Sequence, residues 1–80
     1  MSVTVLLFAS YADALGASSL SVDLPAGATV ADVLTRLRGK PGAEQLPPAP
    51  LVAVNQRYAT AHTIVRTGDE VAIIPPVAGG

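Results

Sequence analysis

The sequence contains no cysteine, no tryptophan and a single histidine. The absence of cysteine excludes disulfides, thiolate metal ligands and cysteine nucleophiles. His62 alone cannot make a metal site, and its polar, turn-like surroundings favour a position on the surface. No glycine-rich phosphate loop and no Ser/His/acid set is present either. The side chains therefore do not indicate a catalytic or metal centre.

Charged and aromatic residues are also scarce. Five basic and six acidic residues make up 14% of the chain, against a typical share of about 25%. Nucleic-acid binding needs a broad basic face with stacking aromatics, which this composition does not supply. No run approaches the roughly 18 apolar residues of a membrane span, and no signal-peptide pattern begins the sequence. We therefore expect a cytoplasmic protein that binds neither nucleic acid nor membranes.

Half of the 80 residues are hydrophobic, and their spacing predicts one α+β domain over residues 1–80. The clearest helix covers residues 29–38, where Thr29 is a good N-cap and apolar residues recur at helical spacing. Strands are predicted at 3–8, 20–24, 51–55 and 70–74, with a short strand and turns in 57–65. Residues 10–19 read as a turn with one helical turn at 11–15, and the proline-rich stretch 40–50 reads as a loop.

One helix can cover only one face of a four- or five-stranded sheet. The alternation of side chains puts Phe8, the last residue of the first strand, and Ile74 on the face away from the helix. Tyr58 is expected beside them. We predict that these three residues form an apolar patch that binds partner proteins. The alternative is that the loop 40–50 folds over this face.

The last six residues follow directly on the final strand and are predicted to form an extended arm: Pro75, Pro76, Val77, Ala78, Gly79 and Gly80. The two prolines cannot continue a sheet ladder. Because glycine has no Cβ, the end of the arm could enter a channel too narrow for any other residue. This indicates that the α-carboxylate of Gly80 is the reactive group. The alternative is a frayed end without chemistry.

The order of elements and the Gly-Gly end resemble the β-grasp, ubiquitin-like sulfur carriers, and most of all the MoaD family of molybdopterin synthase small subunits. The matching stretches are Leu7-Phe8-Ala9, Thr29-Val30-Ala31-Asp32-Val33-Leu34, Ala53-Val54-Asn55-Gln56, and Gly68-Asp69-Glu70-Val71-Ala72 leading to Pro-Pro-Val-x-Gly-Gly. Many members carry Arg-Glu shortly after the Phe-Ala pair, where this chain has Tyr11-Ala12-Asp13. Any partner contact made by that arginine is missing or replaced here.

The resemblance implies that the chain passes through a reaction cycle with three partner proteins. An E1-like, MoeB-like adenylyltransferase uses ATP and Mg²⁺ to adenylate the Gly80 carboxylate, and a sulfur donor protein then supplies the sulfur of a C-terminal thiocarboxylate. The MoaE-like large subunit, in a heterotetramer, receives the arm, and sulfur passes to cyclic pyranopterin monophosphate. The chain itself is expected to bind no cofactor and no metal. Alternatives are a carrier for thiamin (ThiS-like), for cysteine or for tRNA thiolation, a protein modifier, and a binding module whose tail has no chemistry.

Overall fold

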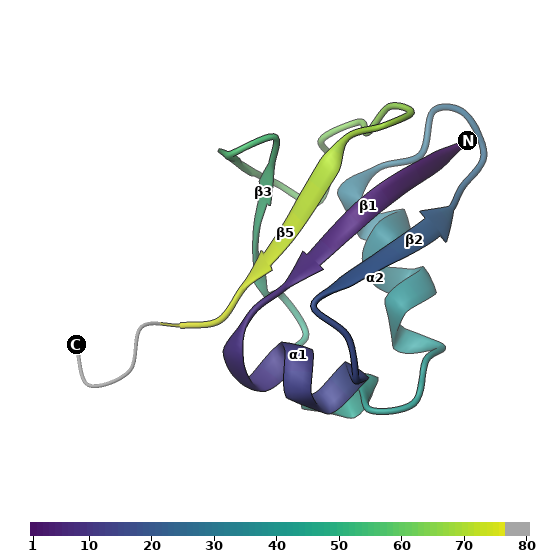
Figure 1. The fold of residues 1–80 in the computed structure, drawn as a ribbon. Coiled ribbons are helices and arrows are strands. Elements are labelled where there is room, and N and C mark those ends of the chain that lie inside the picture. Colours follow the sequence, from purple (N-terminus) through teal and green to yellow (C-terminus); the bar gives the residue numbers. More distant parts are fainter. Residues whose placement is uncertain (77–80) are drawn as a thin grey trace.

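The computed structural model describes residues 1–76, so the predicted arm residues Val77, Ala78, Gly79 and Gly80 lie outside the described part. A five-stranded sheet in the order β2-β1-β5-β3-β4 carries the main helix on one face (Figure 1). The elements are β1 (Ser2–Leu7), α1 (Ala9–Leu15), β2 (Ser19–Asp23), α2 (Val30–Arg38), the short 3₁₀ turn η1 (Ala43–Gln45), β3 (Leu51–Val54), β4 (Arg57–Ala59) and β5 (Glu70–Ile74).

The two central strands, β1 and β5, run parallel, and the other neighbouring pairs are antiparallel. This mixed sheet with one main helix across it is the predicted α+β architecture. The core lies between the sheet and α2. It contains alternate residues of the central strands and the apolar stripe of the helix, all of them buried: Val3, Val5, Leu7, Val71, Ile73, Val30, Val33 and Leu37.

The start of α2 is confirmed. The Thr29 amide donates to the Asp32 carboxylate over 2.8 Å, which forms the returning half of a capping box. Such a box satisfies backbone donors that the first turn of a helix leaves without partners. The apolar stripe then follows at helical spacing, so the sequence signal and the packing agree for this element.

The prediction for residues 8–15 is wrong in two respects. β1 ends at Leu7, and Phe8 is the N-cap of α1 rather than the last residue of a strand. α1 is also longer than the single helical turn expected at residues 11–15. Its formation depends on a distant contact, because Tyr11 is only 5% exposed and belongs to the core. The helix ends at Gly16, whose φ of 76° is in the left-handed region that favours glycine.

The stretch 40–50 is a loop that contains η1, which the sequence did not predict. Ala43 and Leu46 are buried in the core cluster, and η1 contacts α1 and α2. The loop therefore packs on the helical side of the molecule. It does not fold over the opposite face of the sheet, so that alternative is wrong.

Gly42 is the tightest point of this packing, and its replacement by alanine should be costly. A Cβ on Gly42 would overlap the backbone carbonyl of Ala14, and its φ of 89° already disfavours other residues. Gly27 has a similar φ of 84° with open space around it. We expect Gly42→Ala to lower the free energy of unfolding by about 3 kcal/mol and Gly27→Ala by about 1 kcal/mol, measured by urea denaturation. Equal losses would mean that the contact with α1 contributes nothing.

Candidate functional site

The face of the sheet opposite α2, here called the open face, carries a row of apolar side chains. The strand register aligns Leu6 of β1, Ala72 of β5, Ala53 of β3 and Tyr58 of β4. The same register aligns Thr4 with Ser21 and with Glu70 nearer the other end of the sheet. The open face is therefore apolar at the end where β5 finishes and polar at the end where it begins.

A second row of apolar residues lies at the same end of the open face. Leu51 of β3 lies opposite Ile74, the last residue of β5. Phe8 has an extended backbone, so the alternation of β1 continues through it and turns its side chain to the face of Leu6. We call Leu6, Phe8, Leu51, Tyr58 and Ile74 the apolar patch.

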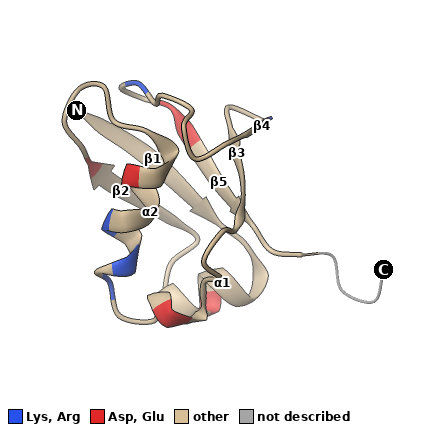
Figure 2. Cartoon of the chain, turned by 180° about the vertical axis from the view of Figure 1, so that it is seen from behind, with Lys and Arg blue, Asp and Glu red and all other residues tan. Residues whose placement is uncertain are grey.

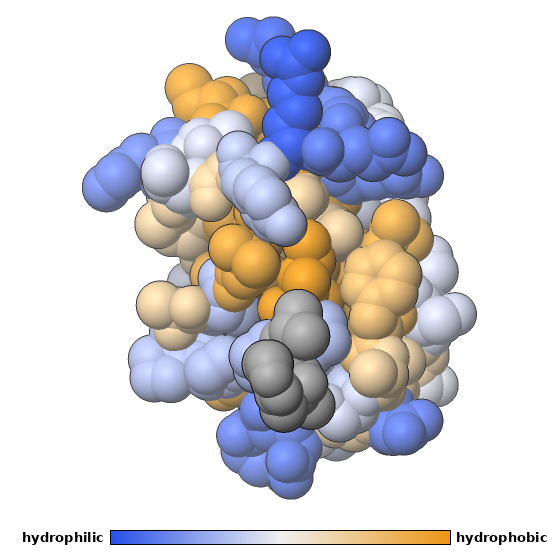
Figure 3. Space-filling view, turned by 90° about the vertical axis from the view of Figure 1, so that its left-hand side faces the viewer, coloured by the Kyte–Doolittle hydropathy of each residue, from blue (hydrophilic) through white to orange (hydrophobic). Residues whose placement is uncertain are grey.

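Much of the patch is accessible to a partner. Phe8 is 46% exposed, Leu51 49% and Tyr58 76%. Leu6 and Ile74 are half-buried. Figure 3 looks onto the side of the molecule from which the C-terminal segment leaves, and apolar surface gathers around that segment, with hydrophilic groups above and below. An apolar cluster of this kind on a small domain typically marks a protein interface.

The C-terminal segment begins at the apolar patch. Pro75 is half-buried, Pro76 is exposed, and neither belongs to a strand. The chain leaves the sheet beyond Ile74 (Figure 1), as the two prolines predicted. The predicted channel residues Val77, Ala78 and Gly79 and the reactive Gly80 lie outside the described residues.

The three partner-binding residues predicted from the sequence lie on one side of the molecule. Phe8, Tyr58 and Ile74 all face the open side, and their role in binding stays a prediction. Leu51 was missed, although it is as exposed as Phe8. Only the register of β3 with β5 reveals it, because that pairing joins residues distant in sequence. His62 is exposed, as expected.

The hairpin at the polar end of the sheet is fixed by Asn55. Asn55 and Gln56 both have positive φ, 50° and 70°, which suits the two-residue turn between β3 and β4. The Asn55 side chain donates to Asp69 over 3.0 Å and accepts from the Glu70 amide over 3.0 Å. Two hydrogen bonds lower the pKa of the Asp69 carboxyl below its usual value. The one from the Asn55 side chain has the larger effect, and the one from the Arg66 amide has the smaller. This network joins the β3–β4 turn to the turn before β5.

The described residues contain no constellation for chemistry of their own. Among residues 1–76, no three His, Cys, Asp or Glu side chains are grouped as a metal site would require, and no polar or charged residue is buried. No helix in this part of the chain is long and apolar enough to cross a membrane. Charged residues belong mainly to the helices and the turns (Figure 2). What the described residues offer is an exposed apolar surface beside the start of the C-terminal segment.

Comparison with known proteins gives consistent results. The family model described as the ThiS family matches residues 5–80. A molybdopterin synthase sulfur carrier subunit from Arabidopsis thaliana is 38% identical and aligns with 98% of this chain and 82% of its own length. One from Dictyostelium discoideum is 35% identical over 95% of this chain and 93% of its own.

Two solved structures share the fold over nearly the whole chain. SAMP1 from Haloferax volcanii is 31% identical with a TM-score of 0.87, and each chain is covered completely. The crystal structure of the BexX/CysO complex from Amycolatopsis orientalis contains a chain that is 27% identical with a TM-score of 0.70, covering 98% of this chain and 99% of that one. The predicted β-grasp, ubiquitin-like fold is confirmed.

Proposed function

The chain belongs to the ThiS family, and from that premise we propose that it is the sulfur carrier subunit of a molybdopterin synthase. The observation that carries the proposal is that two relatives, 35–38% identical over nearly the full chain, are both named molybdopterin synthase sulfur carrier subunit. Two features of the chain support it independently. β5 leads without a turn into the Pro-Pro segment, and the apolar patch surrounds the point where that segment leaves the sheet.

The Gly80 carboxylate is the group that reacts in this proposal. A free carboxylate is a poor acyl donor because its oxygen is a poor leaving group. An E1-like adenylyltransferase with ATP and Mg²⁺ converts it to an acyl adenylate and releases pyrophosphate. AMP then leaves when a hydrosulfide ion supplied by a donor protein attacks the carbonyl carbon. The product is a thiocarboxylate at Gly80. The absence of cysteine protects this group from exchange with thiols of its own chain.

The apolar patch is the surface that the partners share. In the proposed cycle the adenylyltransferase binds it first and the large synthase subunit binds it later, each drawing the arm into its own site. In the large subunit the thiocarboxylate gives its sulfur to cyclic pyranopterin monophosphate, and the two subunits form a cytoplasmic heterotetramer. SAMP1 and a chain of the BexX/CysO complex have the same fold. That the second of these is seen in a complex with another protein supports a carrier that works through partners.

The test is a reconstituted synthase reaction. The thiocarboxylated chain is mixed with the large subunit and cyclic pyranopterin monophosphate, and molybdopterin is measured as its fluorescent oxidation product. We expect one turnover to need two sulfur atoms and therefore two carrier chains. The unmodified carboxylate form serves as the control. A thiocarboxylated chain that yields no molybdopterin, but does supply sulfur to a thiazole or cysteine synthase, would assign it to another pathway.

A second candidate is protein modification, and one observation favours it. SAMP1 from Haloferax volcanii matches this chain more completely than the BexX/CysO structure does. A second crystal structure, 30% identical to this chain, is named a small archaeal modifier protein from the same organism. In that role the activated Gly80 carbonyl would form an amide with a lysine of a target protein. Mass spectrometry of a lysate containing the N-terminally tagged chain separates the candidates, because only a modifier becomes joined to lysines of other proteins. Trypsin cleaves the chain last after Arg66, so the expected adduct on such a lysine is the remnant 67–80.

A further inference from the structure

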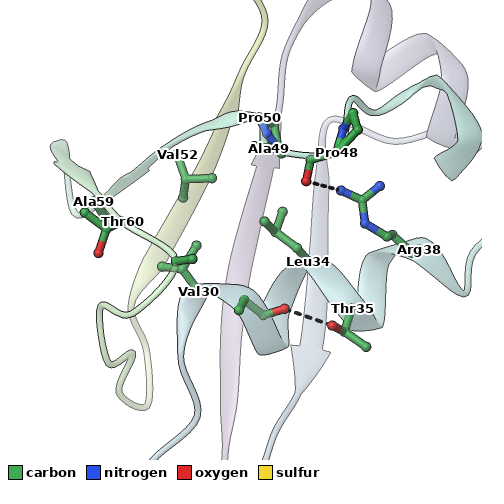
Figure 4. A pocket seen from close by; sticks show the side chains of 12 residues that line it. Val30, Leu34, Thr35, Arg38, Pro48, Ala49, Pro50, Val52, Ala59 and Thr60 are labelled. Carbon is green, nitrogen blue, oxygen red and sulfur yellow. Dashed lines mark hydrogen bonds between the residues drawn. The ribbon is translucent and has the colours of Figure 1, made fainter.

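A groove on the helical side of the sheet shares no lining residue with the apolar patch. It has a volume of about 390 Å³ and lies between α2 and the β3–β4 edge of the sheet (Figure 4). Its walls are mostly apolar, with Val30 and Leu34 from α2, Val52 and Ala59 from the strands, and Pro48 and Pro50 from the preceding loop, while Thr35 and Thr60 add two hydroxyl groups. Small residues, including Ala31 and Ala61, also line it.

One charged side chain is held at the groove. The Nη2 atom of Arg38 donates to the carbonyls of Pro47 and Pro48 over 2.8 and 3.0 Å. A guanidinium carries five N–H donors, and these two bonds use only one of its nitrogens. Arg38 is the single charged residue among those that line the groove in residues 1–76. An immobilised cation beside an apolar wall is suited to a ligand that combines an aliphatic group with a carboxylate.

The strand beside the groove is an edge. β4 pairs with β3 on one side and is the last strand of the described sheet on the other. An edge strand offers backbone donors and acceptors to an added strand. Arg57, at the start of β4, alternates with Tyr58 and so lies on the groove's face of the sheet, and it is exposed. A second cation therefore lies along the same edge.

We infer that this groove binds an acidic, extended segment of a partner protein, which runs along β4, places an aliphatic side chain between α2 and the β3–β4 edge, and sets a carboxylate on Arg38. A second hollow, beside β2, is less suited to such a segment. It is lined by Arg36 and Lys40, but Asp23 lies with them and offsets their charge. The inference concerns a different face from the apolar patch and does not depend on the chemistry of Gly80.

The test uses a defined probe, the peptide acetyl-Glu-Val-Leu-Val-Glu-amide, titrated into the full chain and followed by amide NMR shifts. We expect saturable shifts at Ala31, Leu34 and residues 59–61. The matched peptide with both Glu replaced by Gln should bind about threefold more weakly, and so should the Glu peptide to Arg38→Gln, since an exposed ion pair is worth a few-fold in affinity.

Arg38→Gln also removes the hydrogen bonds to Pro47 and Pro48 and could weaken binding by disturbing the fold. A second variant therefore leaves these bonds in place. Ala31 is exposed in the first turn of α2, where a glutamate is favourable to the helix dipole. Ala31→Glu should weaken binding of the Glu peptide about fivefold through repulsion and lost space. Ala26→Glu adds the same charge at an exposed position outside the groove and should have no effect. Equal binding by these two variants, shifts confined to β2 or the open face, or no saturation would each overturn the inference.

Discussion

Deletion of Gly80 is expected to abolish adenylation of the chain by its activating enzyme while leaving the fold unchanged. The buried core ends at Ile73, and the segment beyond Ile74 adds no strand to the described structure. The reacting carbonyl would therefore be removed without loss of packing. Pyrophosphate release with ATP, Mg²⁺ and the activating enzyme measures the first effect, and the urea midpoint measures the second.

Two substitutions in the arm make the test specific. Gly79→Val keeps the terminal carboxylate but adds a branched side chain, which should slow adenylation at least about tenfold if the activating enzyme encloses the arm closely. Ala78→Gly removes a methyl group and should react at nearly the wild-type rate. Adenylation of the Gly80-deleted chain at the normal rate would mean that another group is activated.

Replacement of a patch residue by aspartate should prevent binding of the large subunit. Leu51 is 49% exposed and lies opposite Ile74 at the start of the C-terminal segment. A central aliphatic anchor of an interface is commonly worth about 2 kcal/mol, and a buried carboxylate adds a further penalty. We expect Leu51→Asp and Phe8→Asp each to raise the dissociation constant at least about thirtyfold, measured by isothermal titration calorimetry.

The matched control for this experiment is Ile64→Asp. Ile64 is also a large exposed apolar residue, at 57%, but it lies opposite Thr29 at the start of α2 rather than on the open face. Its replacement should leave the affinity for the large subunit unchanged. All three variants should give the circular dichroism spectrum of the wild-type chain and elute as monomers in gel filtration. If Ile64→Asp weakens binding as much as Leu51→Asp does, the apolar patch is not the docking surface.

Secondary structure was predicted most accurately where a local sequence pattern determines the backbone conformation. The helix after Thr29 has its capping box and its apolar stripe within ten residues, and β5 was predicted with its observed bounds, Glu70–Ile74. The prediction failed at Phe8 because α1 depends on the burial of Tyr11 against distant parts of the chain. No local pattern reports such a contact.

The candidate site was predictable only in part, for a similar reason. Alternation along one strand identified Ile74 as facing away from the helix, since that requires only the period of a strand. Leu51 needed the register between β3 and β5, which is set by the whole sheet. The chemistry assigned to Gly80 came from the likeness of the entire chain to a known family. The Arg38 groove had no sequence signal, because its parts come from α2, the loop 47–50 and the β3–β4 hairpin.

The measurement that tests the central claim most directly is the intact mass of the chain after incubation with its activating enzyme, ATP, Mg²⁺ and a sulfur donor. The account predicts a mass gain equal to the exchange of one oxygen atom for one sulfur atom, located by fragmentation at Gly80 and absent when ATP is omitted. An unchanged mass under conditions in which the activating enzyme consumes ATP, or a sulfur atom located at any other residue, would contradict it.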